Sequence, residues 1–354
     1  DRCMEDFTEY TMHEFNRRYQ KIKQIAVDQK EPVEKPEAVI LGEQPGAGKS
    51  SMIKHFESLI ADKGTAVISG DDFRKLHPHF NQLYAQYGDD YVDYTQKFSS
   101  QVTERLIDEL SREKYNLIIE GTLRTSAVPI RTAELLKSRG YHVELAVMAV
   151  PPILSYVGTI ERYERMKEIG TTPRMTTKLQ HDNTVNAIVE SIEKVYKSGV
   201  FDDISLQNRK SECLYRMTDT PDIHPGTVLQ HEHNRNITAE ESSYLDNVVE
   251  YIEDRWNEHS GVSADEPEVL TEMRVQVAYA QFKTALSENG LRLTEAVLDN
   301  LSELVKSTGR IWKLEDIAQA YTKGGNINQY ISEIGNELKN QQLEMICLLY
   351  TSDA

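Results

Sequence analysis

The stretch "LGEQPGAGKS" (residues 41–50) has the glycine, lysine and serine spacing of a phosphate-binding loop. In the pattern G-x-x-x-x-G-K-[ST], Gly48, Lys49 and Ser50 supply the second half. Backbone N–H groups of such a loop surround the β-phosphate, the lysine reaches the β- and γ-phosphates, and the serine hydroxyl ligates Mg²⁺. The loop therefore predicts binding of ATP with Mg²⁺, although a glycine-rich turn without a ligand is the alternative. The expected nucleotide contacts are Gly46, Ala47, Gly48, Lys49, Ser50 and Ser51.

Glu43 departs from this pattern, because glycine stands at the first position of the usual loop. Glycine lets the chain turn there without a Cβ atom near the nucleotide. A glutamate can point to solvent, but its negative charge stays close to the phosphates and weakens their binding. We therefore expect a weakened but not abolished affinity for ATP, and tighter binding by a Glu43→Gly variant.

Two adjacent carboxylates, Asp71 and Asp72, follow an apolar run in the stretch "ISGDDFRKLHPHF" (68–80). A carboxylate at this place can accept the proton of an attacking hydroxyl group during phosphoryl transfer. Side chains alternate in an extended segment, so we expect only one of the two to face a substrate. The alternative is that Asp71 caps the turn or helix that follows.

The stretch "IIEGTLR" (118–124) places Glu120 at the end of an apolar strand. A carboxylate in this position can meet Mg²⁺ or its water ligands, as in a Walker-B motif. Thr122 and Arg124 follow directly, and the arginine could bind an anionic group of a substrate. The alternative is a pair of exposed charges at the end of an edge strand.

Basic residues concentrate in the stretch "GTIERYERMKEIGTTPRMTTKLQHD" (158–182) of an otherwise acidic chain. Its central Gly-Thr-Thr-Pro is typical of a hinge, and arginines on a mobile segment can bring positive charge onto a transferring phosphoryl group. We therefore predict a lid. Pairing of neighbouring charges on an exposed helix, such as Glu161 with Arg165, is the alternative. The basic residues are Arg162, Arg165, Lys167, Arg174 and Lys178.

The elements that must position these residues form a strand–helix alternation. Short apolar runs predict strands at 38–41, 65–69, 116–122 and 142–150, and helical periodicity marks the segments between them. Such alternation specifies an α/β fold with a parallel sheet flanked by helices. Ligands of these sheets gather beyond the carboxyl ends of the strands, where the glycine-rich loop, "GDDFR" and "EGTLR" all lie. Further helices are predicted at 6–29, 129–141, 153–198 (broken near "EIGTTPRMT") and 239–257.

The chain is expected to continue beyond this domain. Residues 1–258 are predicted to form the kinase-like domain. The small and polar residues of 259–267 predict a linker, with Asp265 as the N-cap of the next helix. Apolar periodicity then predicts three helices of a small all-helical module at 268–342. Residues 343–354 look like a non-native or disordered tail.

Composition excludes several classes of protein. Hydrophobic residues make up 39% of the 354 residues, which suffices for a packed core, and a net charge of −17 argues against wrapping DNA or RNA. The three cysteines lack the spacing of a disulfide framework or metal site, and no apolar run approaches a membrane span, so we expect a cytoplasmic protein. The pairs His77/His79 and His231/His233 lack a third ligand nearby, so no structural metal is predicted.

Several stretches together resemble the zeta toxin family of bacterial toxin–antitoxin systems. They are "GEQPGAGKSS", "DDFRKLHPHF", "NLIIEGTLRTSAVPIRTAELLKSRGY", "MAVPPILSYVGTIERYERM" and "FDDISLQNRK", and the likeness runs from about residue 5 to about residue 258. The resemblance implies a P-loop kinase fold. It also implies an enzyme that uses ATP to phosphorylate the 3′-hydroxyl of the amino sugar of UDP-N-acetylglucosamine, which poisons the synthesis of cell-wall precursors.

The resemblance also assigns roles to individual positions. Asp71 matches the catalytic base, Lys49 the loop lysine, and Arg162 and Arg174 the arginines that meet the phosphates. The positions that contact the sugar nucleotide or shape its pocket are Glu104, Glu120 and Thr132. Three departures are Glu43, a segment before Arg174 that is one residue shorter, and the module after residue 262, which has no counterpart in the short toxins.

The partner and the acceptor are left open by these residues. Family antitoxins are small helical proteins that block the ATP site, so the C-terminal module is either an inhibitor in cis or a docking module for another partner. Besides UDP-N-acetylglucosamine, the acceptor could be another nucleotide sugar or an antibiotic, although the arginines of "EGTLR" and the lid favour an anionic acceptor. The alternative from another class is a catalytically weak, nucleotide-binding interaction protein.

Overall fold

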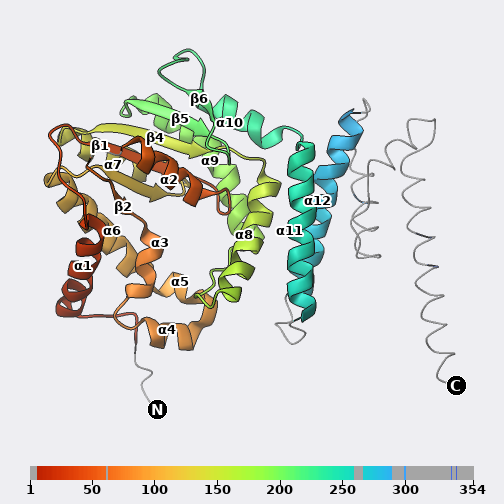
Figure 1. The fold of residues 1–354 in the computed structure, drawn as a ribbon, viewed down its shortest axis with the longest axis horizontal. Helices are drawn as coiled ribbons and strands as arrows, with labels where there is room; N and C mark the ends of the chain where they lie inside the picture. The colour runs from red at the N-terminus through yellow and green to blue at the C-terminus, as the bar shows by residue number, and fades with distance from the viewer. Residues whose placement is uncertain are drawn as a thin grey trace. The chain divides into compact units, whose positions relative to one another are not determined.

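The structure, a computed structural model, describes residues 6–60, 63–258 and 266–288 together with residues 299, 336 and 340. Within these residues the central feature is a six-stranded sheet with the strand order β2-β3-β1-β4-β5-β6 (Figure 1). The strands β1 to β5 pair in parallel, and β6 runs antiparallel to β5. The predicted parallel sheet is thus confirmed, with one antiparallel strand at its edge. The strands are β1 Glu37–Gly42, β2 Ala66–Ile68, β3 Leu117–Gly121, β4 His142–Met148, β5 Asp203–Gln207 and β6 Cys213–Arg216.

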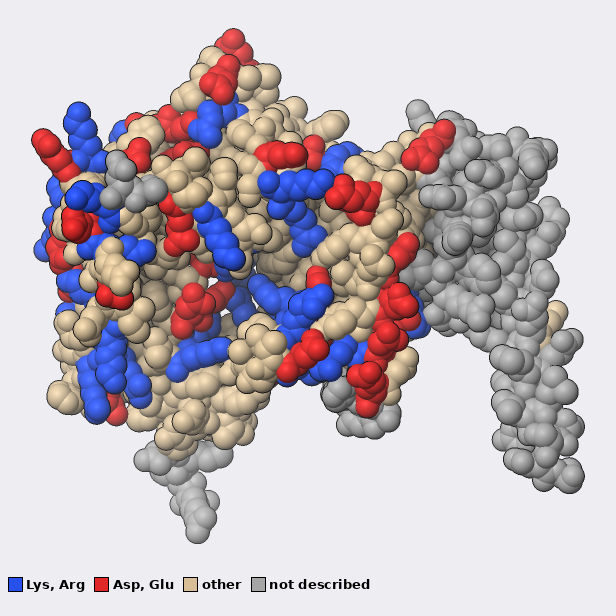
Figure 2. All heavy atoms as spheres, in the orientation of Figure 1, with Lys and Arg blue, Asp and Glu red and all other residues tan. Residues whose placement is uncertain are grey.

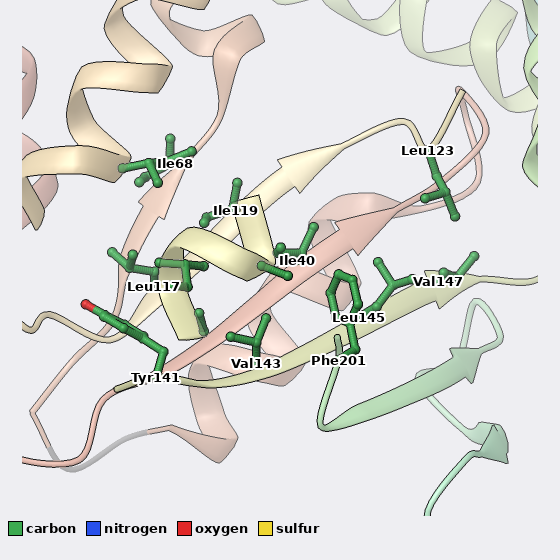
Figure 3. Close-up of a cluster of buried hydrophobic side chains, with 14 of the residues drawn as sticks. Ile40, Ile68, Leu117, Ile119, Leu123, Tyr141, Val143, Leu145, Val147 and Phe201 are labelled. Atoms are coloured by element: carbon green, nitrogen blue, oxygen red, sulfur yellow. The ribbon is translucent and has the colours of Figure 1, made fainter. Parts of the chain in front are cut away.

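Helices cover both faces of this sheet. The longer ones in the first part of the chain are α1 Met12–Val27, α2 Lys49–Leu59, α6 Gln96–Arg112, α7 Ala127–Ser138, α8 Pro152–Glu168, α9 Lys178–Ser198 and α10 Pro225–Asn234. On one face, Ile40 and Ile119 belong to an apolar cluster with residues of α1, α6, α7 and α9 (Figure 3). On the other face, Val39 and Leu41 pack with Phe56 of α2. Strand residues therefore alternate between two cores, as buried parallel strands must.

Two helix starts follow from capping residues. Thr11 and Glu14 form a capping box, so α1 begins at Met12 rather than at the predicted residue 6. Thr177 and Gln180 form a second box, which starts α9 immediately after the predicted hinge segment. The break between α8 and α9 therefore lies at residues 169–177, where the sequence predicts it.

The chain between β2 and α6 differs from the prediction. It folds into short helices, α3 Gly70–Phe73, η1 Arg74–Leu76, α4 Phe80–Tyr87, η2 Gly88–Asp90 and α5 Tyr91–Tyr94. Aromatic rings stabilise them, with the ring centroids of Phe80 and Tyr91 5.3 Å apart and those of Tyr84 and Tyr91 5.7 Å apart. The expectation of an extended segment at Asp71 and Asp72 is therefore wrong, because both lie in the first turn of α3.

The chain divides into two compact units, Asp1–Asn234 and Arg235–Ala354. In the second, α11 Ala239–Glu258 pairs with α12 Glu266–Glu288, where Arg274 Nε donates to Glu253 Oε1 at 2.5 Å. The division precedes the predicted linker at 259–267, so α11 belongs with the C-terminal unit. Apart from residues 299, 336 and 340, the predicted Asp265 cap and the second and third helices predicted within 268–342 lie outside the described residues. Across the described part of the chain, no helix has the length and apolar character needed to span a membrane.

Candidate active site

The glycine-rich loop connects the carboxyl end of β1 with the first turn of α2. Gly46 and Gly48 have φ angles of +81° and +113°, which residues with a side chain rarely adopt. A Cβ atom on Gly46 would also lie 2.1 Å from the Ser155 carbonyl oxygen and 2.7 Å from the Thr159 nitrogen. The loop backbone is therefore pressed against α8, and its N–H groups and the N-terminus of α2 form a cradle suited to an anion.

One side chain of the loop, Gln44, and one from outside it, Arg209, hold this backbone in place. Gln44 Nε2 donates to the Val150 carbonyl oxygen and to Ser155 Oγ, both at 3.1 Å. Arg209 Nη2 donates to the Gly46 carbonyl oxygen at 3.1 Å, and its Nε donates to the Ala47 carbonyl oxygen at 3.3 Å. Arg209 thus occupies the carbonyl oxygens of Gly46 and Ala47, while the Ala47 N–H donates within the loop to the Gln44 carbonyl oxygen at 3.2 Å.

Glu43 is buried and lies among the cations of the site. Only 6% of the residue is exposed, and its Oε1 lies 3.8 Å from Lys49 Nζ. Burial raises the pKa of this carboxyl to about 7, although Lys49, Arg162 and Arg174 act to lower it. The side chain therefore does not point to solvent, which the sequence left open, but faces the groups predicted to hold phosphates.

Lys49 also pairs with Glu120, which β3 carries to the same edge of the sheet. In the β1–β3 pairing Leu41 lies opposite Glu120, so the strand register brings this carboxylate beside the loop. Burial lowers the pKa of Lys49, and the charge of Glu43 opposes this effect. Glu120 Oε2 and Glu43 Oε2 have no hydrogen-bond partner among the residues that the structure describes. One lysine thus stands between two buried carboxylates whose polar groups are not fully satisfied.

Arg162 of α8 and Arg174 of the segment 169–177 supply two further cations. Burial lowers the pKa of both guanidinium groups, and Glu43 counteracts this in each. Arginine keeps its charge in proteins, so both remain cationic. Within the described part of the chain, Arg162 Nε finds no hydrogen-bond partner. Figure 2 shows basic side chains beside acidic ones around a hollow in the face drawn, so local positive charge coexists with the net charge of −17.

Asp71 joins this cluster through Arg174. It follows β2 in the first turn of α3, and its Oδ2 pairs with Arg174 Nη1. Its Oδ1 lies 3.1 Å from Arg74 Nε. Asp72 is exposed, although its charge still acts to raise the pKa of Lys49.

The remaining predicted residues lie outside the buried cluster. Glu104 on α6 is exposed, as are Thr122 and Arg124 after β3, and Thr132 on α7 is half-buried. Ser50 and Ser51 are exposed in the first turn of α2. These residues are therefore free to contact a ligand from solvent, and their predicted roles stay predictions.

The donor set fits a nucleotide phosphate. The two positive-φ glycines form a backbone cradle, and Lys49, Arg162 and Arg174 surround it with positive charge. The unsatisfied Arg162 Nε is a buried donor of the kind that an anionic ligand would complete. The exposed Ser50 hydroxyl and the unsatisfied Glu120 Oε2 are oxygen ligands of the type that Mg²⁺ takes. Glu43 opposes the fit, because its charge competes with phosphate for the same cations.

Sequence reasoning missed three supporting groups: Arg74, Gln44 and Arg209. The spacing of Asp71 and Arg74, three residues apart in a helical segment, was a usable signal for the first. Gln44 and Ser155 are 111 residues apart, and no local pattern reveals their contact. Of the histidine pairs, His77 is buried and accepts a hydrogen bond at Nδ1 from the His79 N–H at 3.0 Å, and burial lowers the pKa of His77 to about 4.

Comparison with known proteins gives consistent matches. The family described as "Zeta toxin" matches residues 21–220. "Toxin zeta" of Streptococcus agalactiae is 38% identical over 262 residues, which are 72% of this chain and 89% of that protein. "Toxin PezT" of Streptococcus pneumoniae serotype 4 is 38% identical over 211 residues, 59% of this chain and 83% of that protein. A solved structure from the PezAT chromosomal toxin–antitoxin system of Streptococcus pneumoniae has a TM-score of 0.62 and 34% identity, covering 72% of this chain and 98% of the matched one.

Proposed function

The chain belongs to the zeta toxin family, and on this premise we propose that it is a kinase that transfers the γ-phosphoryl group of ATP to the 3′-hydroxyl of the amino sugar of UDP-N-acetylglucosamine. The observation that carries the proposal is the convergence of Lys49, Arg174 and Asp71 at the carboxyl edge of the sheet. A phosphoryl-transfer site needs a cationic cradle and a nearby base, and Lys49 with Arg174 would supply the first and Asp71 the second.

The cations would act on the charge that develops during transfer. The loop N–H groups and Lys49 would bind the β- and γ-phosphates, and Arg162 and Arg174 would offset negative charge on the transferring group. Asp71 would take the proton of the sugar hydroxyl while the hydroxyl oxygen bonds to the γ-phosphorus and ADP leaves. Mg²⁺, held through Ser50 and with Glu120 as a further candidate, neutralises charge on the phosphate oxygens when it is bound.

The Lys49 pairs imply an exchange on nucleotide binding. In the structure this ammonium is engaged by Glu120 and lies 3.8 Å from Glu43. We infer that phosphate oxygens take over Lys49, which leaves the two carboxylates to be compensated by Mg²⁺ or by protonation. The pKa of Glu43, raised to about 7, supports protonation as the route for that residue.

Glu43 also favours a second candidate, a catalytically weak, nucleotide-binding interaction protein. Its buried carboxylate lies among all three cations and competes with phosphate for them. Such a protein would bind ATP without turning over a sugar nucleotide. The presence of Lys49, both arginines and Asp71 in one cluster supports the kinase over this candidate.

A helical antitoxin is the partner that we propose. The matched structure belongs to a toxin–antitoxin system, and family membership makes the same arrangement reasonable here. The C-terminal unit is an alternative source of inhibition in cis.

The proposed activity is tested by incubating the purified protein with ATP, Mg²⁺ and a panel of UDP-sugars and measuring product masses. We expect UDP-N-acetylglucosamine to gain one phosphoryl group, and tandem mass spectrometry to place it on the amino sugar. An Asp71→Asn variant is the control for contaminating kinases. Phosphorylation of a different sugar would correct the acceptor, and ATP binding with no transfer to any acceptor would favour the interaction protein.

A further inference from the structure

Arg74 is a buried arginine to which the proposed mechanism gives no role. Its side chain is 8% exposed, and its guanidinium is anchored to α5, to Thr95 and to the first residue of α6. Nη1 donates to the Val92 carbonyl oxygen at 2.7 Å and lies 3.4 Å from Thr95 Oγ1, and Nη2 donates to Gln96 Oε1 at 2.6 Å. Three acceptors on one side of the planar group therefore fix its orientation.

The remaining edge of this guanidinium points at Asp71. Arg74 Nε donates to Asp71 Oδ1 at 3.1 Å, while Asp71 Oδ2 pairs with Arg174 Nη1. The two oxygens of one carboxylate are thus held by two arginines that differ in how they are supported. Arg74 is locked by α5–α6, whereas Arg174 lies on residues 169–177, which form neither helix nor strand.

We propose that Arg74 is the positioning residue of the base: it holds Oδ1 of Asp71, so that Oδ2 is the oxygen that exchanges Arg174 for the acceptor hydroxyl. The proposal rests on the proposed function, in which Asp71 is the base. The proton of the hydroxyl passes to Oδ2 as the new oxygen–phosphorus bond forms and the bond to ADP breaks. Arg174 turns to the phosphate while Arg74 stays, so the base keeps one fixed contact throughout.

Arginine suits this role better than lysine. Only a planar fork with five N–H donors can serve three acceptors of the α5–α6 segment and a carboxylate at once. Burial lowers the pKa of Arg74, while Tyr91 and Asp93 act to raise it, and the group remains charged. Other charged groups near the pair are the exposed Asp72 beside the base and Glu43, whose charge acts on Arg174.

The test compares Arg74→Gln and Arg74→Lys with Arg139→Gln in the full-length protein. Arg139 is a matched control, because it is also mostly buried and lies away from the cluster. Its guanidinium donates to the carbonyl oxygen and to the carboxylate Oδ1 of Asp108, both at 2.6 Å. Melting temperature, kcat, KM for ATP and the pH dependence of kcat are measured for each.

For Arg74→Gln we expect kcat to fall roughly 10- to 10²-fold, as for a misplaced catalytic group, with KM for ATP nearly unchanged. The acidic limb of the pH–kcat profile should move upward by about one pH unit, because an adjacent cation favours the ionised carboxylate. Arg74→Lys keeps the positive charge, so its acidic limb should lie closer to that of the wild type than the limb of Arg74→Gln does. Its kcat should recover less. Arg139→Gln should lower the melting temperature without moving the limb.

An unmoved acidic limb in both Arg74 variants, with losses like those of Arg139→Gln, would overturn the proposal and leave Arg74 a merely structural residue. If the wild-type protein phosphorylates no acceptor, the proposed function fails, and the Asp71–Arg74 contact is then tested by the ¹³C NMR titration of the Asp71 carboxyl. A titration midpoint that rises in the Arg74 variants, but not in Arg139→Gln, supports the contact. A midpoint that stays in place in the Arg74 variants contradicts it.

Discussion

The loop side and the base side of this cluster carry opposite charge arrangements. On the loop side, one cation, Lys49, stands between the carboxylates of Glu43 and Glu120. On the base side, one carboxylate, Asp71, stands between the guanidinium groups of Arg74 and Arg174. In each case the group predicted to act in catalysis is held by two partners of opposite charge.

The two sides differ in burial and in how completely their polar atoms are paired. Glu43 and Glu120 are nearly inaccessible and keep unsatisfied oxygens, whereas the Asp71 side chain is 34% exposed with both oxygens engaged. A buried carboxylate near unsatisfied donors is costly unless a ligand or proton compensates it. The loop side is therefore suited to an incoming anion, whereas the Asp71 carboxylate is held by its two arginines.

The largest expected effect comes from Arg162, whose guanidinium lies near Glu43 on the loop side. Arg162→Gln should lower kcat on the order of 10³-fold or more, because the guanidinium that offsets negative charge on the transferring phosphoryl group is lost. Arg165→Gln is the matched control on the same helix, since Arg165 is exposed and pairs with Glu161. Steady-state kinetics on both variants check this, and equal, small losses would remove Arg162 from the site.

Loss of the base should come next. Asp71→Asn should reduce kcat roughly 10²- to 10⁴-fold while leaving ATP binding intact, because the amide accepts no proton. Asp72→Asn, at the exposed neighbouring position, should lower kcat much less, because Asp72 acts on Lys49 only through its charge. A kcat of Asp71→Asn equal to that of the wild type would contradict the assignment of Asp71 as the base.

Removing the competing charge on the loop side should have a smaller effect of opposite sign. Glu43→Gln, and likewise Glu43→Gly, should lower the Kd for ATP by up to about tenfold, or about 1.4 kcal/mol, because phosphate no longer competes with a carboxylate. Isothermal titration calorimetry measures this directly. Unchanged or weaker binding in both variants would mean that Glu43 does not compete.

The same residue predicts a pH dependence. Since the pKa of Glu43 is raised to about 7, the carboxyl is protonated below that pH and charged above it. ATP affinity should therefore fall as pH rises above about 7, and this component should vanish in Glu43→Gln, which controls for titration of ATP itself. The folded protein should also lose stability between the ordinary carboxyl pKa of 4.5 and about 7 as pH rises, because the unfolded chain gives up this proton first.

The weakest effect is expected from the C-terminal unit. Deletion of residues 262–354 should raise kinase activity if the module inhibits in cis, whereas unchanged activity would exclude that role. Because Arg274 of α12 bonds Glu253 of α11, the deletion also removes a partner of α11. Melting temperature of the truncated protein must therefore be compared with that of an Arg274→Gln variant.

Much of the fold was predictable from local patterns. The strands β1 to β4 are short, continuous apolar runs, and in this sheet such runs are buried on both faces. The loop was predictable because its glycines and lysine are adjacent in sequence. The short helices from α3 to α5 were not predictable. Contacts between aromatic rings, such as Phe80 with Tyr91, stabilise them, and their apolar residues show no helical periodicity.

The site was predictable in its members but not in its pairings. Lys49, Asp71, Arg162 and Arg174 lie near one another, since strand ends and residues 169–177 meet at one edge of the sheet, and their catalytic roles stay predictions. That Glu43 is buried could not be foreseen, because burial depends on residues far away in sequence, such as Arg162 and Arg174. The roles predicted for Glu104, Thr122, Arg124 and Thr132 depend on a bound acceptor and stay predictions.

The most direct test is a crystal structure of the protein with Mg²⁺, a non-hydrolysable ATP analogue and UDP-N-acetylglucosamine. Our account predicts that Lys49 has moved from Glu120 to the phosphates, that Arg174 has left Asp71, and that the sugar 3′-hydroxyl lies within hydrogen-bond distance of Asp71 Oδ2. A nucleotide bound with Lys49 still on Glu120 and Arg174 still on Asp71, and no hexose between them, would contradict it.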